Sequence, residues 1–391
     1  MPIRLRYLAP ALAAVLTTAT ACADNDGDSG SADAPKGATT VTVTSTDDAC
    51  KLSTDTAPSG PLVFKVRNDG SEVTEFYLYA EDGEKVLSEV EDIGPGLSRN
   101  MVVDVDPGTY VTACKPGMSG DGIRDKFTVT DSGKNSAARP AAYQGTLDDA
   151  GEEYAAYVRS ETRQLLDGTR RFVAAYQAGR DAEARDLYPE ARVHWERIEP
   201  VAESFGDLDP KMDARQADLS AGQEWTGWHR LEKDLWPPKN YQPLTHQQRV
   251  RYADQLLADT VELSHRVQKL DVDAYQIANG AKELMDEVAT GKVTGEEEVW
   301  SHTDLYDFQA NVDGARKAFE VLEPAVQTKD PQLAETIEER FADLQKLLDR
   351  YRSDDGFVSY TELGNAQVRE LSDAVNAVAE PLSRLTATVT L

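Results

Sequence analysis

Positive charge is scarce in this chain of 391 residues, in which 41 Lys and Arg stand against 69 Asp and Glu. The formal net charge is −28, and a surface so acidic repels nucleic acid and anionic lipid headgroups. Both are therefore excluded as partners of the folded body. The surplus carboxylates suit a protein that binds cations, although most of them are expected to be solvated surface groups.

Long apolar runs are also lacking. The one apolar stretch, residues 8–16, follows a basic start and is too short to span a bilayer as a mature helix. Small residues lead from it into Cys22, as in a bacterial lipobox. We therefore expect residues 1–21 to be a lipoprotein signal peptide and Cys22 to carry lipid, so that the protein is exported and anchored to the outer face of the cell membrane, or periplasmic. The alternative is a soluble secreted protein that is cleaved nearby.

Cysteine is scarce as well, with 3 residues in the whole chain. Once Cys22 is assigned to the lipid anchor, Cys50 and Cys114 remain. Outside the cytoplasm two cysteines usually pair, so one interpretation is a disulfide. The other is that both sulfurs bind a metal, and the sequence leaves the two open.

Composition divides the rest of the chain into four segments. Residues 22–38 are rich in Asp, Gly, Ser and Ala, which predicts a disordered tether. Residues 39–130 contain many short alternating runs separated by Pro-Gly turns, which predicts a β-sandwich. Residues 131–146 have the composition of a linker. Residues 147–391 carry apolar side chains at helical intervals, which predicts bundles of antiparallel helices.

Two features locate individual helices in this last segment. Thr245 and Gln248 match a capping box at a helix start. His229 and Glu232 are three residues apart, so a helix places both side chains on one face, close enough to share an ion. A neutral imidazole and a carboxylate suit zinc or iron. The pair alone is a weak signal, because it specifies only two residues.

The surroundings of this pair make the signal stronger, because three segments resemble the imelysin family. They are His194–Asp207 (HWERIEPVAESFGD), Thr226–Lys233 (TGWHRLEK) and Asp304–Val312 (DLYDFQANV). Joined to an N-terminal domain that resembles cupredoxins, the whole mature chain is similar to the extracytoplasmic components of bacterial iron-uptake systems.

This resemblance implies the fold and the partners. The fold is multidomain and mostly α, with a cupredoxin-like β-sandwich followed by an all-helical domain of two four-helix bundles. The partners are a membrane iron permease and a haem peroxidase of the same system. The expected function is to capture iron, as Fe²⁺ or Fe³⁺, and to deliver it to the permease.

The imelysin-like segments also supply further candidate ligands. Glu199 and Glu203 are four residues apart and share a helix face, and Asp304 lies in a third matching segment. Iron favours oxygen donors with one or two imidazoles. We therefore expect His229 and Glu232 to anchor the iron site and Glu199, Glu203 and Asp304 to complete it.

The β-domain departs from the copper proteins that it resembles. A blue-copper site needs two His, a Cys and an axial ligand, but no histidine precedes His194. The resemblance implies instead a different kind of second site, in which Cys50, Cys114 and Glu75 bind copper or iron. The alternative remains the Cys50–Cys114 disulfide.

Two enzymatic alternatives compete with metal binding alone, a metallopeptidase and a ferroxidase that use the His229–Glu232 site. The sequence contains neither H-E-x-x-H nor H-x-x-E-H, since Lys233 follows Glu232. A hydrolytic zinc site also needs a general base and an open position. We therefore expect a binding protein and no catalytic residues.

Overall fold

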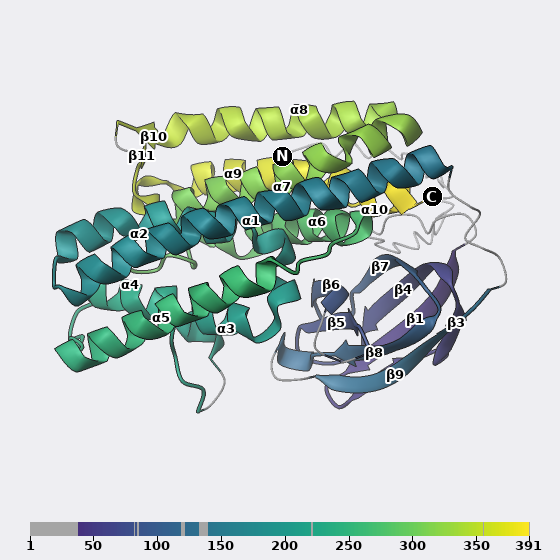
Figure 1. Ribbon diagram of the computed structural model, residues 1–391, viewed down its shortest axis with the longest axis horizontal. Coiled ribbons are helices and arrows are strands. Elements are labelled where there is room, and N and C mark those ends of the chain that lie inside the picture. Colours follow the sequence, from purple (N-terminus) through teal and green to yellow (C-terminus); the bar gives the residue numbers. More distant parts are fainter. Residues whose placement is uncertain are drawn as a thin grey trace, which may run out of the picture. The chain divides into compact units, whose positions relative to one another are not determined.

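A computed structural model describes residues 38–390, except 82, 84–85, 119–121, 133–139, 220–221 and 355 (Figure 1). The expected signal peptide (1–21), Cys22 and nearly all of the expected tether (22–38) lie outside the described residues. In the described part of the chain, no helix is long and apolar enough to cross a membrane.

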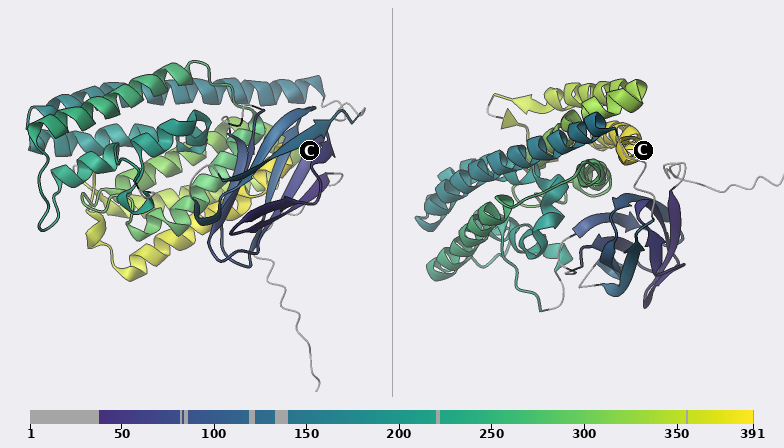
Figure 2. Two further views of the ribbon diagram at one scale, coloured as in Figure 1. Left: turned by 90° about the horizontal axis from the view of Figure 1, so that it is seen from below. Right: turned by 45° about the vertical axis from the view of Figure 1, so that its right-hand side comes forward.

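The N-terminal domain is a β-sandwich of two sheets, with strand orders β2-β1-β4-β7 and β3-β9-β8-β5-β6 (Figure 2). β1 runs parallel to β4, and β3 runs parallel to β9, while the other pairs in the two sheets are antiparallel. The strands are β1 (Thr39–Thr46), β2 (Ala49–Leu52), β3 (Thr56–Pro58), β4 (Gly60–Asn68), β5 (Thr74–Tyr79), β6 (Val86–Ile93), β7 (Ser98–Val105), β8 (Gly108–Cys114) and β9 (Ile123–Thr130). This confirms the predicted β-sandwich.

Alternation along these strands forms the core of the sandwich, because successive side chains point to opposite faces of a sheet. Phe64, Phe76 and Phe127 meet between the sheets, with the ring centroids of Phe76 and Phe127 each 5.3 Å from that of Phe64. Cys50 of β2 and Cys114 of β8 form a disulfide that joins the two sheets.

The C-terminal domain is helical. Its helices are α1 (Ala141–Gln177), α2 (Asp181–Glu196), α3 (Asp209–Met212), α4 (Trp228–Leu235), α5 (His246–Val267), α6 (Ala274–Thr290), α7 (Asp304–Lys329), α8 (Pro331–Leu348), α9 (Asn365–Leu382) and α10 (Leu385–Thr390), with a short hairpin of β10 (Arg352–Ser353) and β11 (Gly356–Phe357). α1 packs against α2 and α5, and α6 to α9 pack on one another (Figure 1). The predicted fold class is confirmed.

Helix starts follow local signals. α5 has the predicted capping box, in which the Thr245 side chain accepts from the backbone N–H of Gln248. α1 begins at Ala141, within the segment expected to be linker, directly after Pro140. Pro140 is the N-cap, with φ −47 and ψ 129, a position at which its missing N–H leaves no helical hydrogen bond unmade. The helix therefore begins at Ala141, ahead of residue 147, where the composition places its start.

An irregular segment, Glu199–Leu208, links α2 to α3 and packs on α6. The close approach depends on Gly280, where a Cβ would lie 1.9 Å from the carbonyl oxygen of Pro200. α6 also contacts the sandwich, because Asn279 donates to the hydroxyl of Ser88 at 2.7 Å and Asp286 pairs with Arg99 at 2.9 Å. The segment that carries Glu199 is therefore held between the helices and a face of the β-domain.

Candidate metal centre

The centre is built around α4, whose first turn carries His229 and whose second carries Glu232. Both side chains are buried, with 1% and 0% exposure. α4 starts after Gly227, which has φ +85 and lies so close to the preceding segment that a Cβ would be 2.1 Å from the carbonyl oxygen of Met212. This contact brings the end of α3, and with it Asp213, beside the imidazole.

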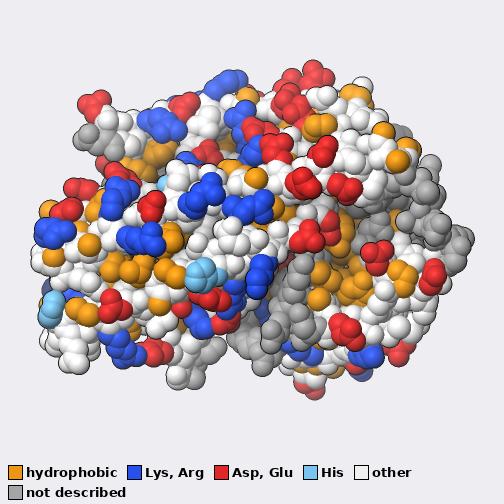
Figure 3. Space-filling view, viewed as in Figure 1, with side chains coloured by type: hydrophobic (Ala, Val, Ile, Leu, Met, Phe, Trp, Pro, Cys, Tyr) orange, Lys and Arg blue, Asp and Glu red, His pale blue; other side chains and the backbone are white. Residues whose placement is uncertain are grey.

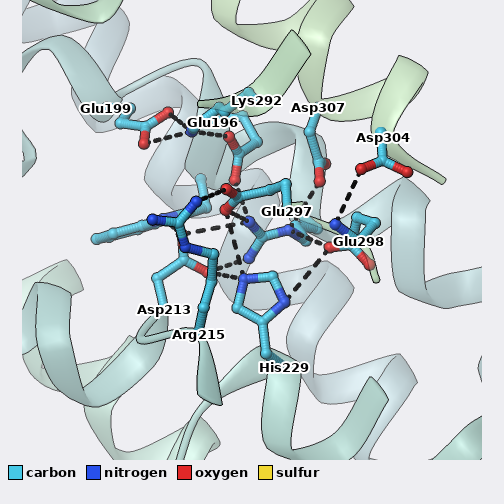
Figure 4. Close-up of polar contacts among 12 residues, drawn as sticks. Glu196, Glu199, Asp213, Arg215, His229, Lys292, Glu297, Glu298, Asp304 and Asp307 are labelled. Carbon is cyan, nitrogen blue, oxygen red and sulfur yellow. Dashed lines mark hydrogen bonds and ion pairs between the residues drawn. The ribbon is translucent and has the colours of Figure 1, made fainter. Parts of the chain in front are cut away.

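Carboxylates surround the His229 ring on two sides (Figure 4). Nε2 lies 3.4 Å from Glu297 Oε1 and 3.5 Å from Asp213 Oδ1. Nδ1 lies 3.3 Å from Glu232 Oε2 and 3.8 Å from Glu298 Oε1. The two sets, Asp213–His229–Glu297 and His229–Glu232–Glu298, each bring three possible ligand atoms within 4.8 Å of one another.

A buried guanidinium balances part of this negative charge. Arg192 of α2 has no exposed surface. Its nitrogens lie within ion-pair distance of five carboxylates, those of Glu196, Asp213, Glu297, Glu298 and Asp307. A buried charge is tolerated only when it is paired and hydrogen-bonded. Here one guanidinium forms ion pairs with carboxylates from α2, α7 and two loops.

The loop before α7 holds Glu297 and Glu298 in place. Asp304, at the start of α7, accepts from the backbone N–H of Glu298 at 3.0 Å. Glu298 in turn accepts from Tyr188 at 3.0 Å and from the hydroxyl of Ser301 at 2.6 Å. Asp304, a predicted ligand, thus borders the cluster and orients the loop that enters it.

The other predicted ligands lie beside a second buried cation. Lys292 Nζ is 2.6 Å and 2.7 Å from the two oxygens of Glu199 and 3.0 Å from Glu196. Asn311 also donates to Glu199, at 2.5 Å. Glu203 lies in the same irregular segment, but its side chain is outside the described part. Glu199 therefore does not contact His229, and its carboxylate forms an ion pair with Lys292 instead.

The expected second metal site does not assemble either. Cys114 lies in the core of the sandwich, opposite Phe76 on the neighbouring strand. Glu75 is the next residue to Phe76 and so faces the other side of the sheet, where it accepts from the hydroxyl of Tyr77 at 3.0 Å. Because Cys50 and Cys114 are joined as a disulfide and Glu75 points away from them, these three residues do not converge on one ion.

Burial and charge shift the pKa values of the cluster in opposite directions. Burial and the charge of Arg192 lower the pKa of His229, but the carboxylates of Glu232, Glu297 and Asp213 outweigh them and raise it to about 9. Burial raises the pKa of Glu297, yet Lys292, His229 and Arg192 hold it well below its usual range. The pKa of Glu298 lies well above its usual range, because of burial and the neighbouring Glu232.

Asp304 shows the same dependence on its surroundings. Burial raises its pKa to about 6, although hydrogen bonds from the backbone N–H groups of Glu298 and Asp304 itself act in the opposite direction. Of His229 and Asp304, only His229 has a pKa above neutral pH, so of these two the imidazole is the group from which an incoming cation must displace a proton.

A cleft leads to one side of the cluster. It has a volume of about 1280 Å³. It runs between the sandwich, at Glu75, Tyr77 and Lys115, and the helical domain, at Asp213, Glu287 and Glu297. His229, Glu232 and Glu298 do not line it. On the face that Figure 3 shows, both acidic and basic side chains lie at the surface.

Sequence reasoning missed Asp213, Glu297, Glu298 and Arg192. Asp213 follows a four-residue helix and is remote in sequence from α4. The two glutamates belong to a run of three, Glu296–Glu298, that is typical of a solvated loop. No local spacing marks any of them, because their convergence depends on tertiary packing.

Comparison with known proteins agrees with the two-domain fold. The model of the imelysin family matches residues 150–385, and that of the cupredoxin-like domain matches residues 10–129. An Efem/EfeO family lipoprotein of Staphylococcus haemolyticus is 42% identical over 265 residues, which cover 67% of this chain and 88% of that protein. The iron uptake system component EfeO of Escherichia coli (strain K12) is 36% identical over 345 residues, which cover 88% of this chain and 89% of that protein.

A solved structure is similar at a greater distance. A protein of Parabacteroides distasonis, described as an iron-regulated protein A precursor, aligns with 65% of this chain and 97% of its own length. Its TM-score is 0.46 and its sequence identity is 14%.

Proposed function

Because this chain belongs to the EfeO family of iron-uptake components and its own cupredoxin-like domain precedes its imelysin domain, we propose that it captures iron outside the cytoplasm in the buried centre around His229. It then delivers the ion to a membrane permease, and a haem peroxidase of the same system is a further partner. Lipid on Cys22 would hold the protein at the outer face of the membrane.

The observation that carries this proposal is the environment of His229. One imidazole lies within 4 Å of four carboxylates, with both ring nitrogens facing acidic oxygens. Carboxylates with one imidazole suit Fe²⁺ or Fe³⁺. The acidic side chains come from α4 and from two loops, so folding brings together donors that the unfolded chain does not hold in one place.

The geometry favours a binding protein over a zinc peptidase, one of the two enzymes that the sequence left open. The other four histidines lie elsewhere: His194 bonds Glu161 at 2.7 Å, His265 is exposed, and neither His246 nor His302 joins either set of ligand atoms. A second imidazole, as in zinc peptidases, is therefore not supplied by the described part of the chain. Assays for peptide cleavage and for oxidation of Fe²⁺, each with Glu232→Gln as control, test the two alternatives.

Calorimetry with Fe²⁺ under anaerobic conditions tests the proposal. The wild-type protein is expected to bind one ion tightly, and His229→Ala to lose that binding while keeping its helical circular dichroism. His265→Ala is the matched control, because His265 is exposed and outside the cluster. An unchanged affinity of His229→Ala for Fe²⁺ would refute the assignment of the centre.

A further inference from the structure

The two sides of the His229 ring are not equivalent. We infer that the ion binds on the Nε2 side, to His229, Asp213 and Glu297, and that Glu232 is a positioning residue that orients the imidazole without ligating the ion. This inference rests on the proposed function. It assigns two ligands that no sequence motif indicates and gives the glutamate of the His-x-x-Glu pair a different role.

Geometry on the Nε2 side fits a shared ion. Donor atoms about 2.1 Å from one metal lie roughly 3.0 Å apart at right angles and roughly 3.4 Å apart at tetrahedral angles. Nε2 lies 3.4 Å from Glu297 Oε1 and 3.5 Å from Asp213 Oδ1. Nε2 is also buried without a hydrogen-bond partner among the described residues, although a buried polar atom normally has one.

On the Nδ1 side, hydrogen bonds already use the oxygens of Glu232. Its Oε1 accepts from the backbone N–H groups of Trp300 at 2.9 Å and Ser301 at 2.7 Å. Its Oε2 bonds His229 Nδ1 at 3.3 Å. A histidine that binds a metal through one nitrogen usually donates from the other to a carboxylate, which fixes the tautomer and the ring orientation.

Glu298, the other acid on the Nδ1 side, is also fully engaged. Its Oε1 lies 2.7 Å from Arg192 Nε and accepts from Tyr188, and its Oε2 accepts from Ser301. Arg192 does not distinguish the two sides, because it also contacts Glu297 Oε1 and Asp213 Oδ1. An ion at Nδ1 would in addition have to break the hydrogen bonds from Tyr188 and Ser301, in a part of the protein that the cleft does not reach.

Access distinguishes the two sides as well. Asp213 and Glu297 line the cleft, and Glu232 and Glu298 do not. In Figure 4, Asp213 and Glu297 lie on one side of the imidazole and Glu298 lies on the other. An ion that arrives with bound water from the cleft therefore meets the Nε2 ligands first, and water from the cleft can complete its coordination.

Cobalt spectroscopy separates ligation from positioning, because the visible absorption of Co²⁺ reports its ligands and geometry. We expect Glu232→Gln to keep the wild-type Co²⁺ bands and to weaken binding roughly 10- to 100-fold, as loss of an orienting group does. Asp213→Asn and Glu297→Gln are expected to change the bands. Bands that change in Glu232→Gln and stay unchanged in the other two variants would overturn the inference.

A measurement on the wild-type protein keeps the test independent of how well the variants fold. Anomalous diffraction from crystals soaked in Fe²⁺ or Co²⁺ should place the ion about 2.1 Å from Nε2. An ion bonded to Nδ1 and Glu232 would overturn this inference and leave the proposed function intact. No bound ion in the wild-type protein, with either metal, would reject the proposed function itself.

Discussion

Arg192 Nε lies 2.7 Å from Glu298 Oε1, and neither side chain has any exposed surface. The same guanidinium serves four further carboxylates. In the metal-free protein it is a fixed internal cation, which keeps mutually repelling acids together before any ion has entered.

Arg192→Met removes this charge and should destabilise the metal-free protein by about 3–5 kcal/mol, the usual cost of breaking a buried ion pair from one side. A bound ion would replace part of the lost charge, so added Co²⁺ should raise the melting temperature of the variant more than that of wild type. Differential scanning calorimetry measures both. Arg192→Lys, which keeps the charge, is the control, and equal metal-induced shifts in all three proteins would contradict this role.

Glu199 should contribute little to iron affinity, because Lys292 and Asn311 already hold its carboxylate. Glu199→Gln is expected to lower affinity less than tenfold, compared with loss of binding in His229→Ala. Titration calorimetry compares the two variants directly. If Glu199→Gln abolished binding, the Lys292 pair would have to open when the ion enters.

Metal affinity should rise with pH. The pKa of His229 is raised to about 9, so below that pH the ion must displace a proton from the ring, and affinity should fall about tenfold for each pH unit between 9 and 6.5. The pH dependence of the free energy of unfolding has the opposite sign. Stability from the protonated ring is fully present below the ordinary pKa of 6.5 and is lost as the pH rises toward 9.

Co²⁺ titrations in buffers of different ionisation enthalpy, between pH 6.5 and 8.5, measure the affinity and the number of protons released. At least one proton per ion is expected. A pH-independent affinity with no proton release would mean that the ring is already neutral in the metal-free protein.

The sequence was most informative where function depends on local spacing. His229 and Glu232 share a helix turn, so their proximity follows from helix geometry alone. The two-domain fold could be predicted equally well, because the alternation of apolar residues in strands and their periodicity in helices are properties of short segments. The capping box at Thr245 was predictable for the same reason.

What the sequence did not reveal depends on contacts between remote segments. The position of Asp213 depends on the contact of Gly227 with Met212, and Glu297 is one of three consecutive glutamates in a loop. Glu199 and Glu203 were expected at the site because they share a spacing and a matching motif. Neither feature could show that the ammonium group of Lys292 lies against Glu199.

The Cys50–Cys114 disulfide should be an important part of the stability of the β-domain. It closes a loop between residues 64 positions apart, and the chain-entropy model gives about 4 kcal/mol for a loop of that length. Cys50→Ser/Cys114→Ser should therefore melt well below wild type, with iron binding in the helical domain retained. Free thiols in the oxidised wild-type protein would contradict the pairing.

Cys22 should carry the membrane anchor. Mass spectrometry of the native protein is expected to find a diacyl or triacyl group at this residue, and Cys22→Ala should be released from the membrane fraction. A native protein that begins at an unmodified residue and is found in the medium would argue for simple secretion.

An ion held by Asp213, His229 and Glu297 would also act as a removable cross-link. It ties the end of α3, the start of α4 and the loop before α7, and it binds the native chain and not the opened one, so its binding free energy adds to that of unfolding. Proteases act on transiently opened chains. The loaded protein should therefore survive longer in the cell envelope than the empty one, so that the supply of iron sets the lifetime of its carrier.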